Sequence, residues 1–62
     1  MKQYLIEATA TRYAETVATA NIREYIRNAF DLKTSYTAHH ARNGYDICDR
    51  TGKEVIYTIT AI

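Results

Sequence analysis

The chain is 62 residues long, and its eight basic and seven acidic side chains give a formal net charge of +1, with no run of either sign. A chain of this length forms one domain with one modest core, and the near-neutral charge argues against a strongly electrostatic nucleic-acid binder. The single cysteine excludes an intrachain disulfide, and nine threonines with six tyrosines and no proline favour β-sheet.

Two segments near the N-terminus are predicted as strands. Residues 3–11 alternate in side-chain character, with Tyr4 and Ile6 on the inner face. Residues 13–20 admit two interpretations, a strand or an N-terminal extension of the helix that follows. The Thr-Val-Ala-Thr composition favours a strand. In that interpretation the helix packs closely against the small side chains of this strand, which are Ala14, Ala18 and Ala20.

The segment from Asn21 to Asp31 is predicted as the single helix. Its apolar side chains recur at i, i+3, i+4, i+7 and i+8 and form one stripe: Ile22, Tyr25, Ile26, Ala29 and Phe30. Asn21 can cap the N-terminus, and Glu24 stands where the second member of a capping box would reach back. Because the stripe needs an apolar surface to cover, we expect the helix to lie on a sheet, with Leu32 tucked under its end.

Two turn signals divide the rest of the chain into a three-stranded meander, with strands at residues 35–42, 45–49 and 54–61. Asn43-Gly44 is typical of a two-residue turn with positive φ at both positions, and residues 49–53 suit a type I turn followed by a glycine bulge. Turn geometry fixes the register of a hairpin. The predicted cross-strand pairs are Ala38 with Asp49, His40 with Ile47, Tyr45 with Tyr57 and Ile47 with Val55.

These elements predict one α+β domain, residues 1–62, in the order ββαβββ, or βαβββ if residues 13–20 are helical. The helix covers one face of an antiparallel sheet, and such a sheet tolerates water on its other face. The open face mixes threonines and charged groups with apolar side chains, among them Leu5, Cys48 and Ile56.

The sequence offers one weak candidate for catalysis. The predicted register brings His39, Cys48 and Glu54 into one row on the open face, where a histidine could activate the thiol. No glycine-rich turn supplies donors for an oxyanion, and a flat sheet face cannot exclude water. Adjacent strand residues such as His39 and His40 point to opposite faces and cannot chelate one metal. We therefore expect no catalytic, metal or cofactor site.

Six residues are predicted to contact a partner: Leu5, Tyr13, Arg23, Arg27, His39 and Ile56. Tyr13, beside the first turn, is the best candidate for an exposed aromatic anchor. Arg23 and Arg27 lie one turn apart on the outer helix face and could contact phosphates. Leu5, His39 and Ile56 represent the open sheet face.

Nothing in the sequence predicts export or membrane insertion. No segment approaches the roughly 18 apolar residues that span a bilayer. Residues 1–11 lack the continuous apolar run of a signal peptide. We expect a cytoplasmic protein.

The opening strand MKQYLIEATAT, the strand ending in TATA, the capped helix NIREYIRNAF and the hairpin around DRTGK together resemble very small proteins encoded by phages and mobile elements. Anti-CRISPR and other anti-defence proteins are among them, and the likeness is one of size and architecture. The resemblance implies a non-enzymatic inhibitor that blocks a larger host protein by surface occlusion in the host cytoplasm. The alternatives are a small nucleic-acid-binding domain that uses the helix arginines, and a homodimer whose open faces or edges pair.

Overall fold

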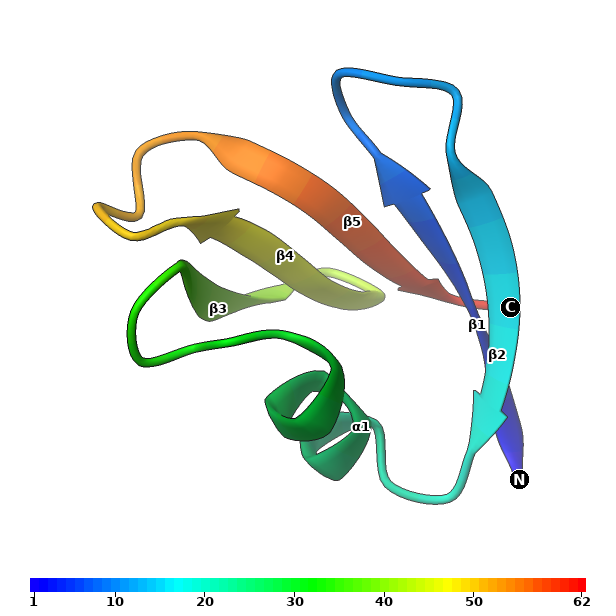
Figure 1. The fold of residues 1–62 in the computed structure, drawn as a ribbon. Helices are drawn as coiled ribbons and strands as arrows, with labels where there is room; N and C mark the ends of the chain where they lie inside the picture. The colour runs from blue at the N-terminus through cyan, green and yellow to red at the C-terminus, as the bar shows by residue number, and fades with distance from the viewer.

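A computed structural model describes all 62 residues as one five-stranded antiparallel sheet with one helix (Figure 1). The elements are β1 (Lys2–Ala8), β2 (Ala14–Thr19), α1 (Ile22–Ala29), β3 (Tyr36–Ala41), β4 (Gly44–Asp49) and β5 (Val55–Ala61). The predicted α+β class and the order ββαβββ are confirmed, and residues 13–20 contribute a strand. The strand order is β2-β1-β5-β4-β3, which places the two terminal strands next to one another inside the sheet and leaves β2 and β3 as edges.

The core lies on the concave face of the curved sheet, where α1 occupies the space between the edge strands (Figure 1). Its centre is formed by Ile6, Ile47 and Ile59, which come from the three middle strands and are almost fully buried. Tyr4 and Ile26 complete this core. Complete burial of one such apolar side chain is worth about 1.5–3 kcal/mol, and further partly buried side chains pack around this core.

The helix is capped as predicted at its N-terminus but not by a full capping box. The side-chain oxygen of Asn21 accepts a hydrogen bond from the backbone N–H of Glu24 at 3.2 Å. The backbone N–H of Asn21 donates to the Thr19 hydroxyl at 3.2 Å, so the nearby end of β2 replaces the expected Glu24 side chain. At the other end Phe30 is already extended, and the helix stops two residues before the predicted Asp31. Leu32 packs against the core, as predicted.

The alanines of β2 face away from the helix, contrary to the prediction. Val17 lies opposite Tyr4 and Glu15 lies opposite Ile6 in the β1–β2 ladder. Because directly opposite residues share a face of the sheet, Val17 and Glu15 lie on the concave side with Tyr4 and Ile6. Ala14 and its even-numbered neighbours therefore occupy the reverse face.

The first hairpin turn is one residue earlier than predicted. Arg42 and Asn43 form the loop, Ala41 pairs with Gly44, and neither Asn43 nor Gly44 has a positive φ. The glycine is needed for another reason, since a Cβ on Gly44 would lie 1.9 Å from the backbone oxygen of Ile59. The observed pairs are Tyr36 with Asp49, Ala38 with Ile47 and His40 with Tyr45.

The second turn is confirmed, but the register beyond it is not. Gly52 adopts φ +78°, and its N–H donates to the Asp49 carbonyl at 3.0 Å. A bulge follows, so that Val55 pairs with Cys48 and does not join the core under the helix. The remaining pairs are Ile47 with Tyr57 and Tyr45 with Ile59.

The loop between β1 and β2 closes over this bulge. The Thr9 hydroxyl donates to the Val55 carbonyl at 2.6 Å, and the Thr9 backbone N–H donates to the Ile56 carbonyl at 3.0 Å. The backbone bond continues the β1–β5 register by one pair beyond Ala8 and Tyr57, and the hydroxyl bond gives the Val55 carbonyl a partner at the bulge. They also hold the loop that leads to Tyr13 against β5.

Candidate functional site

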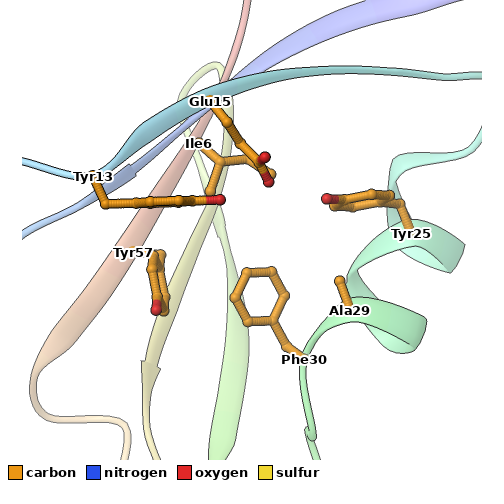
Figure 2. A pocket seen from close by; sticks show the side chains of 7 residues that line it. All are labelled: Ile6, Tyr13, Glu15, Tyr25, Ala29, Phe30 and Tyr57. Atoms are coloured by element: carbon orange, nitrogen blue, oxygen red, sulfur yellow. The ribbon is translucent and has the colours of Figure 1, made fainter.

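A pocket of about 190 Å³ lies on the concave side of the sheet between β2, β5 and α1 (Figure 2). Its lining residues are Ile6, Tyr13, Glu15, Tyr25, Ala29, Phe30 and Tyr57. Four of the seven are aromatic and one is acidic. Small-molecule sites usually measure about 300–1,000 Å³, so the aromatic pocket has the size for one side chain and not for a cofactor.

Three different structural elements bring the polar groups of the pocket together. Tyr13 immediately precedes β2, where its carbonyl accepts a hydrogen bond from the Ala8 N–H at 3.0 Å and closes the β1–β2 connection. Glu15 follows on β2, and the strand alternation that places Val17 on the concave side also directs Glu15 there. Tyr25 comes from the apolar stripe of α1.

Three of the four aromatic rings, those of Tyr13, Tyr57 and Phe30, form a contiguous layer. The Tyr57 ring contacts the Tyr13 ring edge-on, with 6.3 Å between centroids and 81° between planes. It also contacts Phe30, with 5.3 Å between centroids. Such tilted and edge-on arrangements are the favoured ones for aromatic pairs. Tyr13 forms the rim of this layer and remains 48 % exposed.

The acidic group of the pocket lies beside two phenol hydroxyls. Figure 2 shows the hydroxyls of Tyr13 and Tyr25 directed toward one another across the pocket, with the Glu15 carboxylate next to the gap between them. Glu15, positioned to accept a hydrogen bond from Tyr13, raises the pKa of Tyr13 to about 12. Burial raises the pKa of Tyr25, and the charge of Glu15 raises it further. The carboxylate is thus the largest cause of the shift at Tyr13 and the second cause at Tyr25, after burial.

The six predicted partner-binding residues lie on three separate surfaces. Tyr13 belongs to the aromatic pocket. Arg23 and Arg27 are exposed on α1. The half-buried Leu5 and the exposed His39 lie on the reverse face, as the pairing of Leu5 with Thr60 and of His39 with Asp46 shows. Ile56 is half-buried beside the bulge that Thr9 covers.

The predicted row of His39, Cys48 and Glu54 does not form. Cys48 lies opposite Thr37, two positions from His39 in the ladder, and Glu54 precedes β5. The His39 ring is instead 3.1 Å from the Thr37 hydroxyl. Cys48 is buried, and this burial, with the charges of Asp46 and Asp49, raises the pKa of its thiol. That change opposes the formation of a thiolate nucleophile.

Two further findings concern the chain as a whole. No three of its His, Cys, Asp and Glu side chains gather as the ligands of a metal ion would. The helix α1 has neither the length nor the apolar character needed to cross a bilayer.

The edge strand beside the pocket is a second binding feature. β2 pairs with β1 on one side only, so its other side presents free backbone N–H and C=O groups. An extended segment of another protein can pair with such an edge. Because Tyr13 and Glu15 belong to this edge, the aromatic pocket and the free backbone groups form one continuous surface.

Sequence reasoning identifies Tyr13 and misses the rest of the pocket. It places Tyr25, Phe30 and Tyr57 in the core alone and gives Glu15 no role. The available signal is Val17, because a half-buried valine two residues away places Glu15 on the same face. No family model, curated protein or solved structure matches this chain, so function is inferred from the geometry of the site.

Proposed function

We propose that this protein is a small non-enzymatic binding module that holds a larger protein at the aromatic pocket and along the free edge of β2. The observation that carries the proposal is the position of Tyr13. Its half-exposed ring stands at the rim of the pocket, directly before the edge strand β2. Tyrosines in such positions supply large contact area at low entropic cost and are frequent anchors of protein interfaces.

The two parts of this surface have complementary roles in binding. Backbone hydrogen bonds along β2 provide affinity that depends little on the partner's sequence. The pocket provides specificity, because only one kind of side chain fills it well. The strand Ala14–Thr19 is long enough for several such bonds, and its side chains are mostly exposed, so few contacts have to be broken before a partner binds.

Inhibition by surface occlusion follows from this mode of binding. A domain of 62 residues that binds tightly blocks the part of the partner it covers without carrying out any chemistry. The resemblance of the chain to small anti-defence proteins supports a host defence protein as the partner. The near-neutral charge favours steric obstruction over mimicry of nucleic acid.

The proposal is tested by affinity capture with matched baits. The immobilised wild-type chain should retain one large protein from host lysate, and Tyr13→Ser should weaken its retention by roughly thirtyfold, the effect of losing about 2 kcal/mol at an aromatic anchor. The control bait, Arg23→Ala/Arg27→Ala, should retain the partner as wild type does. Far-UV circular dichroism verifies that both variants fold.

Three results would contradict this function. If the wild-type chain retains no protein, the protein-binding function is wrong. If Tyr13→Ser retains the partner as well as wild type does, the tyrosine anchor is wrong. If the arginine variant loses the partner and nuclease treatment of the lysate has the same effect, the nucleic-acid alternative replaces the proposal.

The free β2 edge also favours a second candidate, a homodimer in which two β2 strands pair across a two-fold axis. Light scattering at micromolar concentration decides between the two candidates. A monomer excludes the homodimer. A dimer that dissociates in a variant with a proline at Thr16 supports it, because proline removes a backbone donor from the edge.

A further inference from the structure

We infer that the aromatic pocket receives the primary ammonium group of a lysine side chain from the partner protein. The inference rests on the proposed protein-binding function and specifies the residue that the module recognises. It is carried by the combination of four aromatic rings, two phenol hydroxyls and one carboxylate around a space of about 190 Å³.

The charge of the pocket selects a cation. Glu15 is the one charged residue among the seven that line it. The faces of aromatic rings attract cations as well, since their π-electrons form a negative quadrupole. The Glu15 carboxylate lies beside the gap between the Tyr13 and Tyr25 hydroxyls (Figure 2), and it contributes to the raised pKa values of both. An anionic side chain would be repelled by Glu15 and would find no positively charged partner there.

The number and arrangement of acceptors favour lysine over arginine. An ammonium group carries three donors around one nitrogen, whereas a guanidinium group is a flat fork that suits a bidentate carboxylate. Here the acceptors are one carboxylate and two hydroxyls, which approach the gap from different sides (Figure 2). The Tyr13 hydroxyl, which is positioned to donate to Glu15, keeps a lone pair for the ammonium.

The size and the apolar lining fit the rest of a lysine side chain. Ile6, Ala29 and Phe30 supply the aliphatic and aromatic surface on which a four-carbon stem packs while its charged end stays near polar groups. The volume is below the usual range for small-molecule sites, which favours a single side chain over a free metabolite.

The edge strand β2 explains how a lysine side chain of the partner would reach the pocket. Side chains of a strand alternate between the two faces of a sheet. An extended partner segment paired with β2 therefore directs every second side chain to the concave face, where Glu15 lies. A lysine at one of these positions reaches the pocket without any rearrangement of the sheet.

The inference is tested by NMR titration of the whole chain with n-butylammonium chloride, which reproduces the lysine stem and head group. The signals of Tyr13, Tyr25 and Tyr57 should shift, and n-butanol, a neutral probe of similar size, should bind at least tenfold more weakly. Glu15→Gln should reduce the affinity for n-butylammonium by roughly ten- to a hundredfold, because it removes the charge from one hydrogen bond. The control Glu7→Gln, on the reverse face of β1, should leave the affinity unchanged.

Each contrary outcome identifies what has failed. The cation site is overturned if n-butylammonium and n-butanol bind equally well, or if Glu15→Gln and Glu7→Gln lower the affinity for n-butylammonium equally. Either result leaves the proposed protein-binding function standing. Tighter binding of n-butylguanidinium than of n-butylammonium overturns the assignment to lysine. If n-butylammonium binds as expected but capture finds no protein that depends on Tyr13, the protein-binding function fails and the lysine assignment fails with it.

Discussion

Replacement of Gly44 by alanine is expected to remove most of the stability of this domain. A Cβ at this position would lie 1.9 Å from the backbone oxygen of Ile59, where real Cβ contacts are essentially never below 3.0 Å. The obstacle is a main-chain carbonyl in the neighbouring strand, so no side-chain rotation relieves the contact. The β4 and β5 backbones must separate by about 1 Å near Gly44.

The cost of that separation is large compared with the stability available. Overpacking of this kind typically costs about 1–3 kcal/mol. The hydrogen bond from the Ala61 N–H to the Asn43 carbonyl, 2.7 Å long and adjacent to the contact, contributes about 1 kcal/mol more when it breaks. A domain of this size has roughly 3–5 kcal/mol in total. We therefore expect Gly44→Ala to lower the Tm by at least about 10 °C or to unfold the chain at room temperature.

Thermal and urea denaturation followed by circular dichroism measure this effect, with Gly52 as the comparison. Gly52 has φ +78°, and a Cβ added to it would make only ordinary contacts, the nearest being the His39 ring at 3.4 Å. Gly52→Ala should cost about 1–2 kcal/mol, and Gly52→Asn should cost less because asparagine tolerates positive φ. Gly44→Asn should be as damaging as Gly44→Ala. A Gly44→Asn variant as stable as wild type would refute the close contact. It would instead support the turn predicted from the sequence, in which Gly44 has a positive φ.

The remaining predictions concern two titrating groups. Burial raises the pKa of Cys48, so its thiol should react with a disulfide reagent near pH 8 much more slowly than a free thiol does. Once urea unfolds the chain, the thiol should react at the ordinary rate. A fast reaction in the native state would contradict this prediction. Hydrogen bonding by Thr51 lowers the pKa of Asp49, so its ionised form stabilises the fold above the ordinary carboxyl range, and this contribution is lost as the pH falls through the lowered pKa. In Asp49→Asn, the Tm should therefore fall less steeply with decreasing acidic pH than it does in wild type or in the control Asp46→Asn. An unchanged dependence of Tm on pH would count against the Thr51 interaction.

The candidate site shows which of its parts can be read from a sequence. Tyr13 is predictable as an exposed residue because it lies outside every apolar pattern and next to a turn. Glu15 escapes recognition because the two sides of β2 are nearly equivalent in the sequence, with alanines and a threonine on one side and a tyrosine, a glutamate and a valine on the other. Only the pairing of Val17 with Tyr4 decides which side meets the helix and thereby brings Glu15 beside Tyr25.

The sequence by itself determined the features that depend on a few neighbouring residues. The helix stripe and the Asn21 cap, the buried side of β1, the three strands of the C-terminal meander and the Gly52 turn belong to this group. Their determinants are hydrogen bonds and periodicities within about four residues, and those are visible in any short segment.

Only the tertiary structure decided the strand order, both hairpin registers, the purpose of Gly44 and the assembly of the aromatic pocket. Each of these results from contacts between residues far apart in the chain, such as the approach of Gly44 to the Ile59 carbonyl and of Thr9 to the β5 bulge. A register is selected by the summed burial and hydrogen bonding of several strands at once, and a single bulge moves Val55 out of the core. The combined burial and hydrogen bonding of several strands cannot be read from the pattern of any short segment.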